Sequence, residues 1–293
     1  MGCPRRRSSR PPRARGLRRG VKPGLLAPPP PTKESRLDPI DAAARLLAGA
    51  RRAGPLPGLP QELRPRDLAQ AEAIQHATLA ALGEEIGGWK VGRQGGQPFS
   101  APFPASATVE DRGGLSVALP AGSLIELEIA LRFPAALDPA GVAALRAEDL
   151  PRVAQIATLF EFVQPRFAEG ADPAPLDRVA ECLGNNGGAV RAGATSWSLA
   201  MLDAPPVTRL SQDGAVLARH EGPHVAAPVL PLIEAWIARL AREGRGIAAG
   251  EVLTFGSLTG MRPVPAGGAA YLGEIEGLEA LRCAIALPDT RKP

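Results

Sequence analysis

The spacing of apolar side chains changes once along this chain, from a helical to a strand-like period. Alanine and leucine recur every three to four residues over 38–53 and again over 66–82, which predicts two amphipathic helices joined by a proline-rich loop. From residue 88 onward, short apolar runs are separated by glycine, proline and aspartate, a pattern typical of strands and turns. We therefore expect the fold to begin with helices and to continue as a β-rich body.

The apolar runs set the positions of the expected elements. The predicted strands lie at residues 89–91, 116–118, 124–133, 154–163, 189–192, 207–210, 215–220, 251–254, 270–275 and 278–286. Two further helices are predicted over 139–150 and 228–243. Together these elements predict an α+β fold, with an N-terminal helical layer over 36–87 and a β-rich domain over 88–293.

Positive charge is concentrated at the N-terminus. Residues 1–32 contain eight arginines, one lysine and no acidic residue, so the formal net charge of +4 for the whole chain becomes −5 for the rest. Residues 1–35 are also rich in proline and glycine, which predicts a disordered tail that the folded part does not need. Such a tail could bind nucleic acid or an anionic surface, or target an organelle, but its prolines and glycines oppose the amphipathic helix of a transit peptide.

The rest of the composition indicates the cellular compartment and the kinds of partner that we expect. The chain has no secretory apolar segment and no run long enough to span a membrane. Three cysteines and three histidines are too few and too scattered for a disulfide framework or for a zinc site. We expect a soluble, cytoplasmic protein that has no membrane partner, has no nucleic-acid partner and assembles into a homo-oligomer.

Two glutamates one residue apart are the strongest sign of chemistry. Glu126 and Glu128 stand in an apolar run, and alternation along a strand places both carboxylates on one face, roughly 6 to 7 Å apart. At an effective dielectric constant of about 20, two such anions repel by roughly 2 to 3 kcal/mol, which a divalent cation, an arginine or a shared proton would offset. Glu161 lies in a similar run and would complete a hard-cation site for Mg²⁺ or Mn²⁺. The alternative is a solvated strand face.

Three other segments carry polar groups in places where a ligand can approach. Lys90 lies in a glycine-flanked strand, where its ammonium can face an anion, although a surface lysine is the simpler interpretation. The turn at 184–188 includes Asn186 beside a second amide. The turn at 256–260 brings Gly256, Ser257 and Thr259 together as donors for a carboxylate.

In this order, the segments resemble the 2-keto-4-pentenoate hydratases and the 2-oxo-3-hexenedioate (4-oxalocrotonate) decarboxylases of the fumarylacetoacetate hydrolase superfamily. The resemblance covers about residues 38–290. The matching motifs are Ala73-Ile74-Gln75, Gly88-Trp89-Lys90-Val91-Gly92, Ser100-Ala101-Pro102, Ile125-Glu126-Leu127-Glu128-Ile129-Ala130, Glu161 with Arg166, and Gly256-Ser257-Leu258-Thr259-Gly260. The resemblance implies a β-rich fumarylacetoacetate-hydrolase-like fold, a mixed β-roll or barrel, in which residues 88–293 are the catalytic domain.

The resemblance also implies roles for the candidate residues. Glu126, Glu128 and Glu161 would hold Mg²⁺ or Mn²⁺, and a small 2-keto acid would be the substrate. Lys90 would hold the substrate anion or assist proton transfer, and the second role needs a lowered pKa. The residues expected to bind substrate are Ser257, Thr259, Gly256 and Asn186, whereas Arg166 would support the strand of Glu161. The reaction implied is hydration of a 2-hydroxy-2,4-dienoate to a 4-hydroxy-2-oxo acid.

Three departures from the family pattern leave other functions open. Gln164 and Asn185 stand where the family has acidic residues, and Phe255 replaces a threonine. None of these changes removes an expected metal ligand. A decarboxylase, another keto-acid lyase or hydrolase on this fold, and a relative that has lost catalysis all remain alternatives to the hydratase.

Overall fold

Two helices begin the fold, as the apolar spacing predicts. In the computed structural model, which describes residues 38–194 and 196–288, they are α1 (Pro39–Ala53) and α2 (Leu68–Leu82). The predicted tail, residues 1–35, lies outside the described residues.

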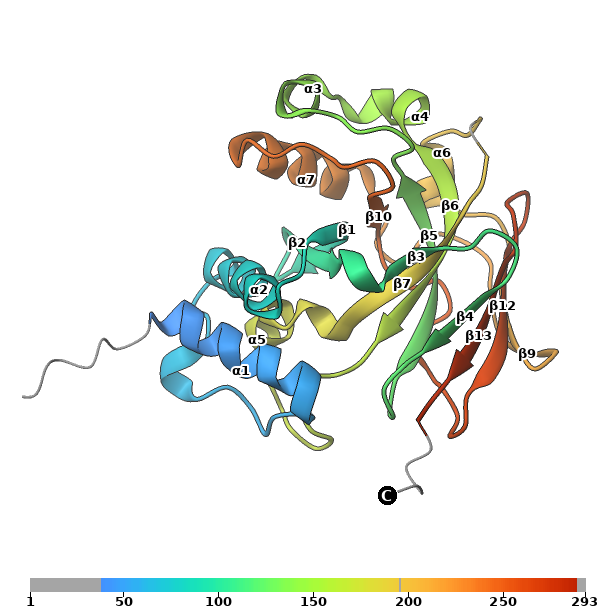
Figure 1. Cartoon of the computed structure of the whole chain (residues 1–293). Coiled ribbons are helices and arrows are strands. Elements are labelled where there is room, and N and C mark those ends of the chain that lie inside the picture. Colours follow the sequence, from blue (N-terminus) through green and yellow to red (C-terminus); the bar gives the residue numbers. More distant parts are fainter. Residues whose placement is uncertain (1–37, 195, 289–293) are drawn as a thin grey trace, which may run out of the picture. The chain divides into compact units, whose positions relative to one another are not determined.

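Aspartate side chains fix where both helices start. Asp38 and Asp67 each accept a backbone N–H hydrogen bond at 2.8 Å, which satisfies one of the donors that the first turn of a helix leaves free. The two helices pack against each other, and α2 also packs against α5 (Pro175–Ala180), a short helix that the spacing did not predict. Figure 1 shows these three helices side by side at one end of the molecule.

The main sheet has eight strands and curls around a concave face. The strand order is β2-β1-β10-β5-β6-β7-β3, and β11 pairs with β5 off this path. The bounds are Ile86–Gln94 for β1, Gln97–Pro104 for β2, Thr108–Glu110 for β3, Leu124–Arg132 for β5, Gln155–Val163 for β6, Asn185–Ala192 for β7, Val252–Thr254 for β10 and Arg262–Pro263 for β11. The curl lets side chains of strands that are not neighbours meet across the concave face.

Strand β2 is an element that the apolar spacing does not predict. It contains Pro98, Pro102 and Pro104, which have no backbone N–H to donate. The sheet tolerates them because β2 is an edge strand that pairs only with β1. A segment with three prolines has the composition of a loop, and only its place at the sheet edge makes it a strand.

A second sheet of five strands packs against the main sheet. Its order is β4-β13-β12-β8-β9, with bounds Leu115–Ala118 for β4, Thr208–Gln212 for β8, Ala215–His220 for β9, Ala269–Ile275 for β12 and Leu281–Ala286 for β13. Leu127, Phe160 and Tyr271 are among the buried side chains between the two sheets. A Cβ at Gly273 would lie 2.8 Å from both Leu127 and Phe160, so this close approach of β12 requires glycine.

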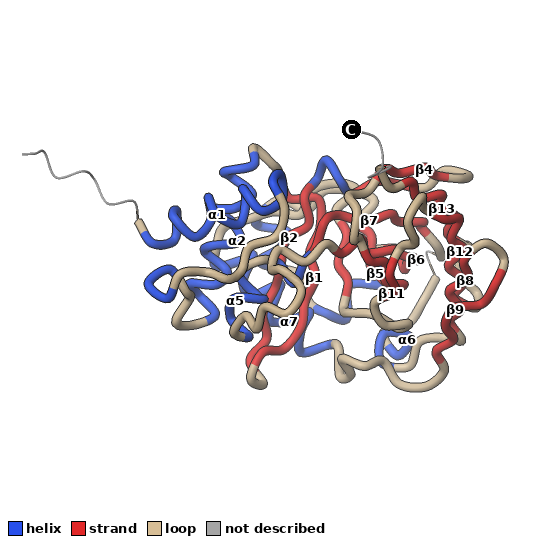
Figure 2. The backbone as a smooth tube through the Cα atoms, turned by 90° about the horizontal axis from the view of Figure 1, so that it is seen from below, coloured by secondary structure: helices blue, strands red, loops and turns tan. Residues whose placement is uncertain are grey.

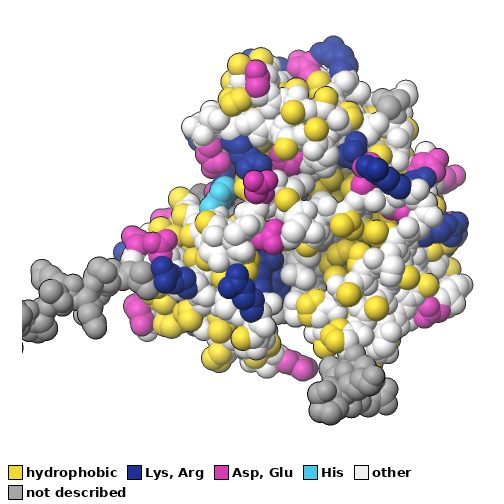
Figure 3. Space-filling model, in the orientation of Figure 1, with side chains coloured by type: hydrophobic (Ala, Val, Ile, Leu, Met, Phe, Trp, Pro, Cys, Tyr) yellow, Lys and Arg dark blue, Asp and Glu magenta, His cyan; other side chains and the backbone are white. Residues whose placement is uncertain are grey.

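The largest hydrophobic core lies between the main sheet and α7 (Leu230–Arg242), which the sequence predicts over 228–243. Three short helices complete the described fold: α3 (Pro139–Ala144), α4 (Leu150–Val153) and α6 (Ala200–Asp203). Figure 2 shows α1, α2, α5 and α7 grouped toward one end and the small sheet at the other, with α6 near the small sheet. In the space-filling view, acidic and basic side chains are interspersed over one face of the molecule (Figure 3).

Two local predictions are wrong. The helix expected over 139–150 ends at Ala144, because Leu145 is extended and the Asp149 carboxylate then accepts the Arg146 N–H at 3.1 Å to start a new turn. The segment 184–188, expected to be a turn, instead leads directly into β7, and the turn lies at residues 182–184. The α+β class is confirmed, and within the described ranges no helix has the length and apolar character needed to cross a membrane.

Candidate metal centre

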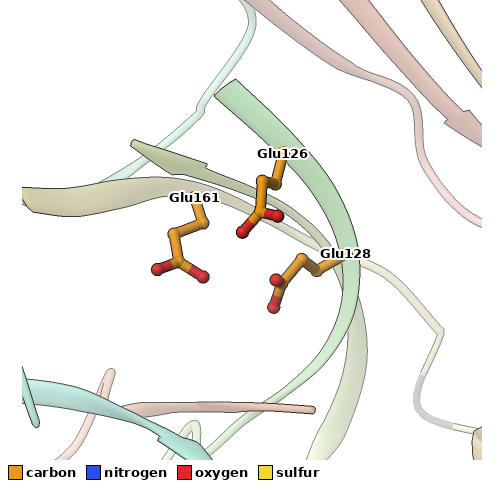
Figure 4. A group of neighbouring side chains, drawn as sticks. All are labelled: Glu126, Glu128 and Glu161. Carbon is orange, nitrogen blue, oxygen red and sulfur yellow. The ribbon is translucent and has the colours of Figure 1, made fainter. Parts of the chain in front are cut away.

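Three glutamates from two adjacent strands converge on one point of the concave face. Glu126 and Glu128 point to the same side of β5, and Glu161 of β6 lies directly opposite Glu126 in the antiparallel register. Ile125 and Leu127 of β5 point the other way, into the core between the sheets. One carboxylate oxygen from each glutamate lies within 4.8 Å of the other two, as Figure 4 illustrates. Glu128 and Glu161 are fully buried, and Glu126 is 7% exposed.

Lys90 of β1 reaches into the middle of this carboxylate cluster. Its Nζ lies 2.6 Å from Glu161, 3.1 Å from Glu126 and 3.3 Å from Glu128. Strand β10 separates β1 from β5, so the contact depends on the curl of the sheet. Burial would lower the pKa of Lys90, but the three carboxylates outweigh it and raise that pKa well above its usual range. Lys90 is therefore an ammonium here, which suits binding an anion, whereas the lowered pKa that proton transfer needs is not found.

The cluster carries more negative charge than one ammonium can balance. Burial, opposed by the attraction of Lys90 and helped by the neighbouring carboxylates, raises the pKa of Glu161 to about 8. Burial also raises the pKa of Glu126, with Glu128 contributing. A bound divalent cation would offset this excess charge and hold all three groups ionised.

The donor set fits Mg²⁺ or Mn²⁺. Oε1 of Glu128 is buried, accepts no hydrogen bond from any described residue, and has Lys90 Nζ at 3.3 Å. Three carboxylate oxygens match the preference of these hard cations for oxygen ligands. Among the described residues, no histidine or cysteine belongs to this group.

Backbone and side-chain donors behind the cluster orient the glutamates. Thr254 donates its hydroxyl to Glu128, and Gly256 N donates to Glu128 Oε2 at 3.3 Å. Asn185 donates its side-chain amide to Glu161 Oε1 at 3.0 Å and is fully buried. The sequence prediction did not assign Thr254 or Asn185 to the site. The sequence signals that could have found them are the positions of Thr254, next to the predicted substrate-binding turn, and of Asn185, next to Asn186.

The predicted substrate-binding turn is fastened to β5 between the two glutamates of that strand. Thr259 Oγ1 accepts the Leu127 N–H at 3.2 Å, and Leu258 N donates to the Leu127 carbonyl at 2.9 Å. Ser257 Oγ accepts the Thr259 N–H at 3.3 Å, and a hydrogen bond from Ser257 is one of the influences that lower the pKa of Glu126. Gly256, Ser257 and Thr259 thus lie beside the carboxylate cluster.

Asn186 lies next to the site, but its side chain is directed elsewhere. Its Oδ1 accepts a hydrogen bond from Arg166 Nη2 at 3.1 Å. Arg166 itself is 1% exposed and also donates to the Asn185 carbonyl at 2.8 Å, so it braces the start of β7 next to the strand of Glu161. The structure therefore brings Lys90 and the three glutamates together and places the predicted substrate-binding turn beside them. Asn186 instead belongs, with Arg166, to the contacts that brace the start of β7.

Comparison with family models and with curated proteins finds no match for this chain. Solved structures do match its fold. 4-Oxalocrotonate decarboxylase from Pseudomonas putida G7, complexed with magnesium and adipate, has a TM-score of 0.63 and 20% identity, over 84% of this chain and 97% of that chain. The same enzyme complexed with calcium and acetate has a TM-score of 0.61 and 19% identity, over 84% and 96%. The chain has the fumarylacetoacetate-hydrolase-like fold that the sequence predicts.

Proposed function

We propose that this protein is a metal-dependent enzyme that acts on a small 2-keto acid. The observation that carries the proposal is the carboxylate cluster, in which three buried glutamates lie within 4.8 Å of one another and share one ammonium. Burying three acids together is costly, so a fold that maintains such a cluster is best explained by a cation. The similarity to a decarboxylase complexed with magnesium supports the same class of chemistry.

Each part of the site has a distinct task in this chemistry. Glu126, Glu128 and Glu161 would hold Mg²⁺ or Mn²⁺, which would supply a Lewis acid for the negative charge on the 2-oxo oxygen of the enolate, the species that precedes protonation of C3 and follows its deprotonation. Lys90, as an ammonium, holds the substrate anion. Ser257 donates its hydroxyl to the substrate carboxylate.

Within this class we propose hydration. A 2-hydroxy-2,4-dienoate would lose its enol proton and gain a proton at C5 to give the conjugated 3-en-2-one, water would add at C4, and protonation of the resulting enolate at C3 would give the 4-hydroxy-2-oxo acid. Lys90 is the only cation paired with the three glutamates among residues 38–194 and 196–288, which suits a substrate with one carboxylate.

Decarboxylation of a 2-oxo-3-hexenedioate is the second candidate. A second substrate carboxylate would need another cation, and Arg262 of β11 is well placed because its Nε donates to the Thr259 carbonyl at 3.2 Å, next to the predicted substrate-binding turn. The fold likeness to 4-oxalocrotonate decarboxylase also favours this candidate.

One experiment separates the two reactions. Purified full-length protein with Mg²⁺ is mixed with 2-hydroxypenta-2,4-dienoate or with 2-oxo-3-hexenedioate, and the loss of ultraviolet absorbance is followed together with release of CO₂. Loss of the dienol without CO₂ supports hydration, whereas CO₂ from the hexenedioate supports decarboxylation. No reaction with either substrate, together with no measurable binding of Mg²⁺ or Mn²⁺, would refute the proposal.

A further inference from the structure

Asn185 holds one oxygen of a proposed metal ligand in a fixed direction. Its Nδ2 donates to Glu161 Oε1 at 3.0 Å, while Lys90 Nζ contacts the other oxygen, Oε2, at 2.6 Å. The Asn185 side chain is itself fixed, because its Oδ1 accepts the Gly187 N–H at 3.0 Å. Both ends of this fully buried amide are therefore used, and the amide cannot rotate without losing both hydrogen bonds.

The main chain at Asn185 is braced from two sides. Its carbonyl accepts a hydrogen bond from Arg51 Nη2 at 2.9 Å and another from Arg166 Nη2 at 2.8 Å. Arg51 belongs to α1, so this contact links the N-terminal helices to the cluster. Two guanidinium groups on a single carbonyl are a strong and directional anchor.

The chain enters Asn185 through an unusual backbone conformation. Cys182, Leu183 and Gly184 have φ angles of 62°, 55° and 77°, three successive residues in the left-handed region. Cys182 and Leu183 are not glycines, and such a conformation costs energy at each of them. Strain of this kind persists where the surrounding structure demands it, and here it ends in the residue that contacts Glu161.

We propose that Asn185 is a positioning residue of the metal centre, whose amide holds Glu161 Oε1 so that Oε2 stays directed at the middle of the cluster. The proposal rests on the metal site of the proposed function. Groups behind a metal ligand orient it before the cation arrives, and their loss typically lowers metal affinity by about 10- to 100-fold. Asn185 acts through Glu161 and has no contact with the cation or the substrate in this assignment.

The test compares two neighbouring amides in the full-length protein. Asn185→Leu keeps the approximate shape of the side chain and removes the donor to Glu161. Asn186→Leu is the matched control, because its amide contacts Arg166 and none of the three glutamates. Titration calorimetry with Mg²⁺ and with Mn²⁺ measures affinity, and thermal unfolding in EDTA measures the stability of each metal-free variant. We expect Asn185→Leu to bind both ions about 10- to 100-fold more weakly and Asn186→Leu to stay within about three-fold of wild type.

A further variant keeps the proposal testable if Asn185→Leu does not fold. Arg51→Met removes one anchor of the Asn185 carbonyl from a partly exposed position and leaves the buried amide intact. We expect a smaller loss of metal affinity, about three-fold or more. Wild-type affinity in a folded Asn185→Leu variant, or in Arg51→Met where Asn185→Leu does not fold, would mean that Asn185 is only structural, and the proposal would be wrong.

The wild-type titration separates this inference from the proposed function. If wild-type protein binds neither Mg²⁺ nor Mn²⁺, the metal site itself is wrong and both proposals fall. If wild-type protein binds metal and Asn185→Leu binds it equally well, only the role of Asn185 is wrong.

Discussion

Replacing Lys90 by methionine tests the electrostatics of the carboxylate cluster most directly. The substitution keeps a long, flexible side chain and removes an ammonium that lies 2.6, 3.1 and 3.3 Å from the three carboxylates. At an effective dielectric constant of about 20, two unit charges about 5 Å apart interact by roughly 3 kcal/mol, so three ionised carboxylates repel by about 10 kcal/mol in total. Protonation of Glu161 relieves part of this repulsion, because its pKa is already raised to about 8.

The measurable cost should therefore be that of breaking a buried ion pair, about 3 to 5 kcal/mol. For a domain of this size, 1 kcal/mol corresponds to about 2 to 4 °C in Tm, so the metal-free variant should unfold about 10 °C below wild type. The affinity for Mg²⁺ should change in the opposite direction. Removal of a positive charge from the middle of the cluster should raise it by about ten-fold or more, because the cation no longer competes with an ammonium.

Thermal unfolding in EDTA and in saturating Mg²⁺, together with calorimetric titration of the metal, checks both effects. Lys90→Arg is the matched control, since it keeps the charge and should keep most of the stability of the metal-free protein. Our reasoning would be refuted by a Lys90→Met variant that is as stable as wild type in EDTA, or by one that binds Mg²⁺ more weakly.

Three further predictions address other parts of the chain. Glu128→Gln should lower affinity for Mg²⁺ by at least about 100-fold and abolish turnover while the protein stays folded. Calorimetry measures the affinity and circular dichroism checks the folding, and persistent binding of Mg²⁺ would refute this prediction. Burial raises the pKa of Glu181 to about 7 from its usual 4.5, so the folded protein holds that proton where the unfolded chain has lost it. The contribution of Glu181 to stability should be fully present below pH 4.5 and fall toward pH 7 by up to about 3 kcal/mol. Glu181→Gln should remove this part of the pH dependence measured by urea titration, and an unchanged pH dependence in the variant would contradict the prediction. Deletion of residues 1–35 should leave kcat/KM unchanged, and a large loss would show that the tail takes part in catalysis.

Local sequence was enough to predict the elements in which apolar residues recur with a single, regular spacing. The helices α1 and α2 combine apolar repeats with aspartate caps, so both signals agree on where they begin. The prolines of β2 and the glycines of β7 indicate loops or turns, but pairing within the sheet makes both segments strands. The end of α3 was missed because the Asp149 carboxylate favours a new turn over helix continuation.

The sequence by itself determined that Glu126 and Glu128 share a face, because the period of two along a strand needs no knowledge of the rest of the chain. It also supplied Lys90 and Glu161 as separate candidates. Only the tertiary structure decided that these four groups meet, because their contact depends on the β5–β6 register and on a curl that brings β1 across the concave face. The sequence marked Asn185 only as a neighbour of Asn186, and its contact with Glu161 was decided by the tertiary structure: the amide reaches Glu161 only once β7 is paired beside β6 and the left-handed turn before it is closed.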